Sequence, residues 1–279
     1  MSLPIISADD RMRQTRGVKA LILGPPGVGK TSLLRTIDPA STLFVDLEAG
    51  DLAVQDVAVD QMRPGTWEEC RDLACFLAGP NLNVRPKDQY GQDHYDRAVA
   101  RFGSADALKK YSTIFVDSIT VAGRLCFNWC EHQPESFNAK GEKNLLGTYG
   151  LHGRELIQWI TRLQHARAQN VVFVALLEEK EDDFKRKSWV MQVDGSKAGR
   201  EMPGIVDEVI TLAIIRPDDG PPYRAFVTDP ANEWGFPAKD RSGRLDAMEK
   251  PHLGDLFAKL NDTNTARGQS AKTAPRAAA

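Results

Sequence analysis

The residues from Gly24 to Thr31 have the types and the spacing that bind the polyphosphate of a nucleotide. They read Gly-Pro-Pro-Gly-Val-Gly-Lys-Thr and fit the phosphate-loop pattern G-x-x-x-x-G-K-[ST] at every position. Glycine takes positive φ values and lets backbone N–H groups approach phosphate oxygens that side chains would block. We therefore assign nucleotide binding to Gly24, Pro25, Pro26, Gly27, Val28, Gly29, Lys30, Thr31 and Ser32.

Two side chains of this loop have separate tasks in the pattern. Lys30 reaches the β- and γ-phosphates, and the hydroxyl of Thr31 is a ligand for Mg²⁺. The apolar run Val18–Leu23 predicts a buried strand before the loop, and Thr31–Arg35 predicts a helix after it, with its positive end towards the β-phosphate. The alternative is a chance match in an ordinary strand-to-helix turn, and the strand, the lysine and the hydroxyl together argue against it.

Two later apolar runs end in acids, and both predict buried parallel strands. They are Thr42–Glu48 and Ser112–Ser118. Because α/β sheets bind their ligands at the carboxyl ends of the strands, these acids should lie at the same edge as the phosphate loop. We expect Asp117 to hold Mg²⁺ through water, since this ion keeps part of its hydration shell. An apolar run ending in Asp is weak evidence by itself and gains its weight from the phosphate loop.

Length, composition and charge indicate a globular chain whose binding sites must be local. The 279 residues are 42% hydrophobic, and the formal net charge of -2 gives no overall attraction for nucleic acid or an anionic membrane. No apolar run approaches the roughly 18 residues that span a bilayer. No charged-then-apolar leader opens the chain. We expect a cytoplasmic protein with no membrane partner.

The four cysteines predict buried thiols. Cys70 and Cys75 form one pair and Cys126 and Cys130 the other, and neither spacing is the two-residue knuckle of structural zinc sites. Zinc binding with the nearby His132 is the alternative.

One α/β domain, over residues 17–261, accounts for the predicted elements. Residues 1–16 are predicted to be a flexible arm, 262–279 a disordered tail, and 81–103 an insertion with a short helix and no assigned role. Further helices are predicted at 119–129, 149–168 and 253–260, and further strands at 170–177, 206–215 and 223–228.

The order of these motifs resembles the RecA-like core of P-loop ATPases, and more specifically the small phage-encoded RecA-like ATPases of single-strand annealing and recombination. The likeness covers roughly residues 17 to 262 and rests on Gly24–Thr31, Phe115–Thr120, Gly147–Gly150, Leu163–Arg167 and Ala238–Gly243. It implies a mostly parallel central sheet flanked by helices, and hydrolysis of ATP with Mg²⁺.

The resemblance also implies roles for three residues outside the loop. Glu48 stands where the family carries its catalytic glutamate, at the end of the strand that follows the phosphate-loop helix. Its alternative role is a strand-end acid that caps the turn at 49–51. Lys197 and Arg200 precede the strand at 206 and are the candidate cations for the site of a neighbouring subunit. Their alternative role is a solvated loop.

Two loops, at 133–147 and 178–197, match the family's DNA-facing loops. Phosphate contacts are expected from basic residues and base stacking from one aromatic: Lys140, Lys143, Lys185, Arg186, Lys187 and Trp189. The alternative is a flexible hairpin whose nearby acids, Glu181, Asp182 and Asp183, cancel the basic charge.

The function implied by the resemblance is an ATPase that binds single-stranded DNA and promotes homologous pairing or strand annealing in phage recombination. Expected partners are single-stranded DNA, further copies of the chain in a filament or ring, and a single-strand-binding protein, all in the host bacterial cytoplasm. Two alternatives stay open: a nucleotide-dependent regulatory or assembly switch that binds a protein, and a RecA-core helicase-type motor. DNA stimulation of hydrolysis separates the switch from the other two, and strand unwinding identifies the motor.

Overall fold

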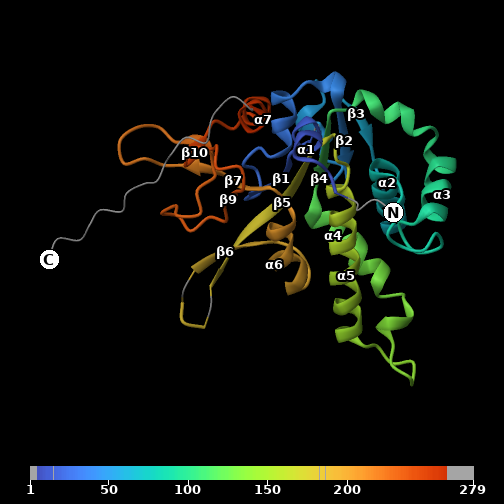
Figure 1. The fold of residues 1–279 in the computed structure, drawn as a ribbon. Helices are drawn as coiled ribbons and strands as arrows, with labels where there is room; N and C mark the ends of the chain where they lie inside the picture. Colours follow the sequence, from blue (N-terminus) through green and yellow to red (C-terminus); the bar gives the residue numbers. More distant parts are fainter. Residues whose placement is uncertain (1–4, 15, 182, 186, 263–279) are drawn as a thin grey trace.

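A computed structural model describes residues 5–14, 16–181, 183–185 and 187–262 (Figure 1). Its strands are β1 (Lys19–Gly24), β2 (Thr42–Asp46), β3 (Asp60–Met62), β4 (Thr113–Asp117), β5 (Asn170–Glu181), β6 (Lys187–Met191), β7 (Glu208–Ile215), β8 (Tyr223–Val227), β9 (Lys239–Asp240) and β10 (Met248–Glu249). Its α-helices are α1 (Ala8–Arg13), α2 (Trp67–Ala78), α3 (Gln92–Phe102), α4 (Ile119–Cys130), α5 (Leu145–Gln164), α6 (Ser196–Ile205) and α7 (Leu253–Asn261).

The described strands form one sheet, in the order β10-β8-β7-β1-β5-β4-β2-β3, with β6 beside β5 and β9 beside β7. The strands from β7 to β3 in this order pair in parallel, whereas β6, β8, β9 and β10 add antiparallel edges. The central strands are buried throughout and mostly apolar, as expected for a parallel sheet covered on both faces. The predicted α/β fold, a mostly parallel sheet flanked by helices, is confirmed.

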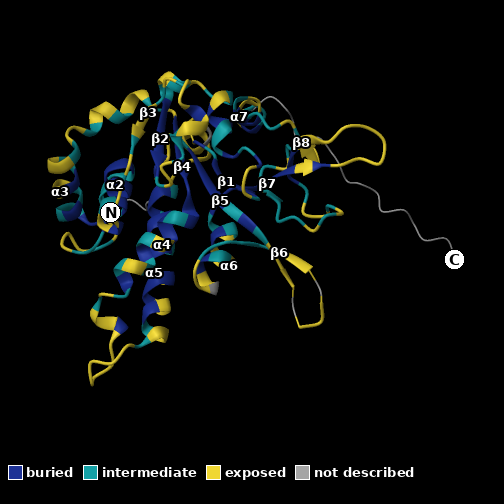
Figure 2. Cartoon of the chain, turned by 180° about the vertical axis from the view of Figure 1, so that it is seen from behind, coloured by how far each residue is buried: buried dark blue, intermediate teal, exposed yellow. Residues whose placement is uncertain are grey.

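The two faces of the sheet carry layers of unequal thickness (Figure 2). Residues of α2, α4, α5 and α6 pack on one face, where the rings of Trp67 and Trp159 lie 5.7 Å apart. The indole N–H of Trp159 donates to the Cys70 carbonyl oxygen at 2.8 Å, which joins α5 to α2. The other face is covered by α7 and a short 3₁₀-helix, η1 (Thr31–Thr36). The phosphate loop therefore belongs to the thin layer.

The segment after the phosphate loop, predicted as a helix at Thr31–Arg35, is a short 3₁₀-helix. The hydroxyl of Thr36 donates to the Leu33 carbonyl oxygen at 2.6 Å, and Ile37 is already extended. Pro39 follows soon after and disfavours helical backbone at the residue before it. Further short 3₁₀ turns are η2 (Pro39–Ser41), η3 (Asp51–Val54), η4 (Ala105–Lys110) and η5 (Pro134–Ser136).

The polar stretch 178–200 contains regular structure that the sequence did not predict. The strand β5 continues to Glu181 and pairs with β6 as an antiparallel hairpin, and α6 follows from Ser196. The insertion at 81–103 contains α3, which confirms its predicted short helix. The predicted flexible arm contains α1, and the predicted tail from 263 onwards lies outside the described residues.

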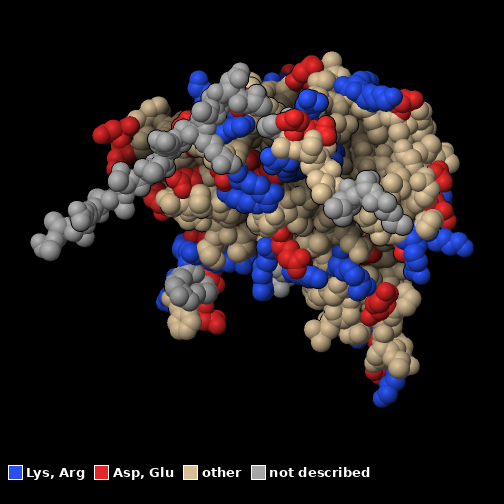
Figure 3. Space-filling model, in the orientation of Figure 1, with Lys and Arg blue, Asp and Glu red and all other residues tan. Residues whose placement is uncertain are grey.

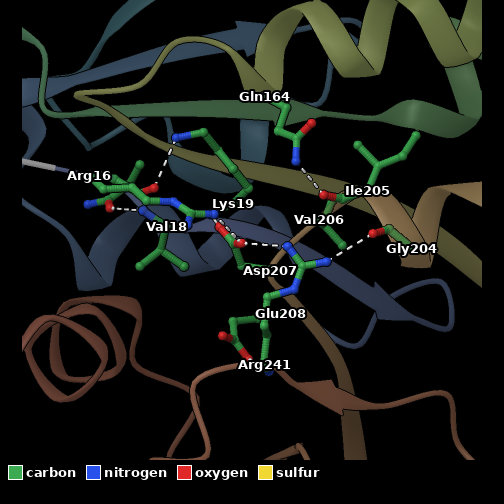
Figure 4. A network of polar contacts seen from close by, with 12 residues as sticks. Arg16, Val18, Lys19, Gln164, Gly204, Ile205, Val206, Asp207, Glu208 and Arg241 are labelled. Atoms are coloured by element: carbon green, nitrogen blue, oxygen red, sulfur yellow. Dashed lines mark hydrogen bonds and ion pairs between the residues drawn. The ribbon is translucent and has the colours of Figure 1, made fainter. Parts of the chain in front are cut away.

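A network of hydrogen bonds and ion pairs lies at the amino end of β1, the end opposite to the phosphate loop (Figure 4). Asp207 lies between two guanidinium groups and accepts from Arg16 at 2.7 Å and from Arg241 at 3.0 Å. The buried Lys19 donates from Nζ to the Gln169 carbonyl oxygen at 2.7 Å, and its backbone N–H donates to Asp207 at 3.1 Å. These contacts fasten the residues before β1 to β7.

Glu208, the next residue on β7, faces Asp240 across the β7–β9 pair. Burial raises the pKa of Glu208 to about 8, and the charge of Asp240 acts in the same direction. The folded protein therefore keeps a proton on Glu208 at pH values where an exposed glutamate has lost it.

We predict that this proton makes stability depend on pH. Between the ordinary pKa of a glutamate and about 8, the unfolded chain binds fewer protons at this residue, so the free energy of unfolding falls as pH rises. The expected loss is on the order of 3 kcal/mol. Glu208→Gln should remove it in urea unfolding at about pH 5 and pH 8. The exposed Glu233→Gln is the control, and an unchanged slope in Glu208→Gln would contradict the prediction.

Candidate active site

The phosphate loop leaves β1 at Gly24 and enters η1 at Thr31. Gly27 and Gly29 have φ values of 74° and 98°, a region in which side chains are strained. A Cβ on Gly24 would lie 2.8 Å from the Leu212 carbonyl oxygen, so this position also needs glycine. The glycines of the sequence motif are thus required by the backbone as well as by a ligand.

Lys30 folds back onto its own loop. Its side chain is buried, and Nζ donates to the carbonyl oxygens of Gly24 and Pro25 at 2.9 Å each. Burial lowers the pKa of Lys30, while the negative charges of Asp117 and Glu48 oppose this shift. Phosphate oxygens would give this ammonium group stronger, charge-assisted acceptors than two backbone carbonyls.

Thr31 and Asp117 meet as the sequence predicted. The hydroxyl of Thr31 donates to Asp117 Oδ2 at 2.5 Å, although the residues come from η1 and from the end of β4. Burial raises the pKa of Asp117 to about 6, and the hydrogen bond from Thr31 opposes that shift. A hydroxyl and a carboxylate side by side are hard oxygen ligands that fit Mg²⁺ with water completing its shell. The donor set is therefore compatible with the expected metal.

Glu48 is exposed, and the hydroxyl of Ser118 donates to its Oε1. Asp46, which lies beside Asp117 in the β2–β4 register, accepts the Gly50 N–H at 3.1 Å. In the described residues it is therefore Asp46, and not Glu48, that caps the turn after β2. Glu48 is held by Ser118 instead, beside the acid that accepts from Thr31.

The structure does not bring the other predicted residues into this cluster. Lys197 and Arg200 lie exposed on α6, where the stem of Lys197 packs on Gly153 of α5. Lys185 and Lys187 are exposed on the β5–β6 hairpin, Lys140 and Lys143 on the loop before α5, and Arg186 lies outside the described residues. These basic residues therefore lie on surfaces that do not include the phosphate loop.

Trp189, the residue expected to stack on a base, is half-buried at the base of the hairpin. Its ring packs against Phe236, with centroids 5.1 Å apart, and its N–H donates to the Trp234 carbonyl oxygen at 3.1 Å. The hairpin aromatic with most of its surface open to solvent is Phe184, which is 79% exposed. Trp189 stands at the base of the hairpin and Phe184 near its tip, so Phe184 is a further candidate for stacking on a base.

Three residues that lie in or beside this cluster were not among the predicted site residues. Asp46 caps the turn that carries Glu48, Ser118 holds Glu48, and the guanidinium group of Arg224 on β8 lies against Gly29. Asp46 and Ser118 stand next to predicted residues, so their proximity was a usable signal. Arg224 is far from the phosphate loop in the sequence, and no sequence motif indicates that it lies beside the loop.

All four cysteines are free thiols in buried positions, as predicted. Within the described part of the chain, no group of three or more His, Cys, Asp or Glu residues is arranged to hold a metal ion. Among those same residues, no helix has the length and apolar character needed to cross a bilayer.

Replacing Lys30 should separate nucleotide binding from folding. Mg-ATP at about one hundred times its dissociation constant should stabilise the wild-type protein by about 2.7 kcal/mol. In Lys30→Ala this stabilisation should be largely lost, because the buried ammonium group that faces Asp117 and Glu48 is gone. Thermal unfolding with and without Mg-ATP measures the effect, with the exposed Lys87→Ala as the control. Equal stabilisation of Lys30→Ala and wild type would show that this loop does not bind the nucleotide.

Comparisons with known proteins place the chain in a family. No curated protein matches it. Among solved structures it is similar to an ATPase from the type III secretion system of pathogenic bacteria, with 12% identity, a TM-score of 0.37 and coverage of 71% of this chain and 51% of that one. This chain thus spans about half the length of that ATPase. It is also similar to the RadB recombinase, with 15% identity, a TM-score of 0.35 and coverage of 77% and 89%. An AAA domain model matches residues 16–242, and the chain therefore belongs to the AAA domain family.

Proposed function

We propose that this protein is an Mg²⁺-dependent ATPase of the RecA type that binds single-stranded DNA and promotes homologous pairing or strand annealing in phage recombination. The observation that carries the proposal is the meeting of Lys30, Thr31 and Asp117 with Glu48 at one edge of the sheet. A buried cation, a metal-ligand pair and an exposed acid are the groups that hydrolysis of a nucleoside triphosphate needs.

Hydrolysis would proceed by in-line attack of water on the γ-phosphate, and positioning and charge would provide most of the catalysis. Glu48 orients or deprotonates the water, and Ser118 keeps the carboxylate in place. Lys30 exchanges its two carbonyl acceptors for phosphate oxygens and balances their charge. Thr31 and Asp117 would hold Mg²⁺, which would neutralise part of the charge on the phosphates.

Assembly would complete the site. Lys197 and Arg200 are exposed and three residues apart on α6, so both point from one side of that helix. Such cations can serve the phosphate loop of a neighbouring copy, as an arginine supplied by another subunit does in related ATPases. The proposed assembly is a filament or ring of this chain.

DNA binding is proposed for the two segments that project beyond the carboxyl edge of the sheet, the β5–β6 hairpin and the loop before α5 (Figure 1). Figure 3 shows basic side chains along this lower rim with acidic ones between them. Lys187 pairs with Glu179 at 3.1 Å, and Lys143 donates to the Glu131 carbonyl oxygen at 2.8 Å. Lys140 and Lys185 thus have the more available charges, and Phe184 supplies the exposed ring for a base.

One observation favours the alternative of a nucleotide-dependent switch that binds a protein. Leu145 and Leu146, at the start of α5, are 61% and 86% exposed. They lie beside the proposed DNA loop, where a protein partner, such as a single-strand-binding protein in the bacterial cytoplasm, would cover them. Whether DNA stimulates hydrolysis decides between the two functions.

Glu48→Gln should bind ATP normally and hydrolyse it at least about a hundred times more slowly. The amide cannot accept a proton from water, although it keeps the size of the carboxylate. Equilibrium binding and steady-state hydrolysis measure the two properties, with Glu178→Gln as a control, because Glu178 pairs with Lys180 outside the cluster. Normal turnover by Glu48→Gln would remove this residue from the mechanism.

Single-stranded DNA should stimulate ATP hydrolysis several-fold, and the stimulation should weaken as salt is added because phosphate contacts release counterions. The double variant Phe184→Ala/Lys185→Ala should lose most of the stimulation and keep its DNA-free rate. Lys109→Ala is the matched control, since η4 precedes the amino end of β4. Hydrolysis that does not respond to DNA in the wild-type protein would favour the protein-binding switch.

A further inference from the structure

We propose that Arg224 is a second cation of the nucleotide site, and that it binds the polyphosphate in the same subunit as the phosphate loop that it contacts. This inference rests on the proposed ATP binding and names a residue that the phosphate-loop motif does not contain. Three features of the fold carry it: the height of Arg224 on the sheet, the face that it occupies, and its contact with Gly29.

The strand pairing places Arg224 at the level of the phosphate loop. Leu23 of β1 lies opposite Thr211 of β7, and Arg224 of β8 lies opposite Ile214, three residues further along β7. A strand rises about 3.3 Å per residue, so Arg224 stands roughly 10 Å beyond Leu23 in the direction in which the loop leaves β1. The strand β8 thus carries the arginine past the end of β1.

The alternation of side chains along β8 puts Arg224 on the face that the loop covers. Arg224 and Phe226 are two residues apart and therefore share one face of the sheet. Phe226 is fully buried in the cluster that contains Val28 of the phosphate loop and Leu33 of η1. Arg224 lies on the same face of the sheet as Phe226, two residues nearer the edge at which β1 ends.

The guanidinium group of Arg224 touches the loop itself. A Cβ placed on Gly29 would lie 3.1 Å from Nη1 and 3.3 Å from Cζ of Arg224. Gly29 directly precedes Lys30, in the stretch whose backbone N–H groups bind phosphate in this motif. A cation at this distance from the loop backbone is within reach of a phosphate that the loop holds.

Arg224 has no acid of its own. Eight other arginines of the described chain form ion pairs, namely Arg16, Arg35, Arg63, Arg71, Arg85, Arg101, Arg154 and Arg241. Within the described residues, Arg224 is exposed and makes no ion pair or side-chain hydrogen bond. An arginine presents up to five N–H donors in a planar fork that matches phosphate oxygens, and these donors are open here.

The two cations would therefore divide the work. Lys30 is buried and donates to two carbonyl oxygens of the loop. Arg224 is exposed and would contact the polyphosphate from the solvent side. Glycine is needed at position 29 for a second reason besides its positive φ. A side chain there would displace the guanidinium group of Arg224.

The test is equilibrium binding of ATP with Mg²⁺ to the full chain and to three single variants. Arg224→Ala should weaken binding about tenfold or more, and Arg224→Lys should restore part of the affinity because it keeps charge but loses the fork. Arg216→Ala, on the same hairpin and equally exposed, should bind like wild type. Without nucleotide, Arg224→Ala should unfold at the wild-type temperature.

Three outcomes would overturn the inference, and they are distinguishable. If the wild-type protein binds ATP and Arg224→Ala binds it equally well, Arg224 is not part of the site, although the proposed function stands. If the wild type does not bind ATP at all, both the proposed function and this inference fail. If mixing Arg224→Ala with Lys30→Ala restores wild-type affinity, Arg224 serves the neighbouring subunit and the assignment within one subunit is wrong.

Discussion

Parallel strand pairing is the constraint on which the site depends. The strand β5 separates β1 from β4, and β2 follows β4, so the carboxyl ends of four neighbouring strands reach the same edge. The register then sets the depth of each group: Gly24 lies beside Leu176, and Asp46 beside Asp117. A shift of one residue would turn every side chain of a strand to the opposite face and separate these groups. The apolar burial of both faces is what makes such a shift costly.

The charges at this edge are mutually dependent because they are buried. Burial disfavours the charged form of Lys30 and of Asp117, and the attraction between the two groups opposes both shifts. In the structure, Lys30 donates to loop carbonyl oxygens, and Asp117 accepts from Thr31. Phosphate oxygens would be stronger, charge-assisted acceptors for Lys30 than these carbonyl oxygens.

The sequence was sufficient for the parts of the site that lie in one short motif or at the end of one apolar run. Lys30, Thr31 and Asp117 were predicted because a loop pattern and a strand pattern each identify residue types at fixed spacing. The hairpin of β5 and β6 was not, because its polar residues carry no alternation that separates a solvent-exposed ribbon from a loop. The contacts of Trp189 and Arg224 could not be predicted either, because they are tertiary contacts. The packing of Trp189 on Phe236, and the contact of Arg224 with Gly29, depend on residues that approach only after the sheet has assembled.

The same strand that separates β1 from β4 also links the ATP site to the proposed DNA surface. Leu176 of β5 pairs with Gly24, and its N–H donates to the hydroxyl of Thr120, just after Asp117 and Ser118. From Leu176 the strand continues without interruption to Glu181 in the hairpin, a rise of roughly 16 Å. A shift of the hairpin would therefore displace Leu176. This residue pairs with β1 in the sheet, and its N–H donates to Thr120, which follows Asp117 and Ser118. Coupling of this kind needs a rigid element with two discrete arrangements, and a continuous strand supplies the rigid element. Under the proposed function, the second arrangement would come from the nucleotide. Lys30 would exchange the carbonyl oxygens of Gly24 and Pro25 for phosphate oxygens, and Gly24 is the residue that pairs with Leu176.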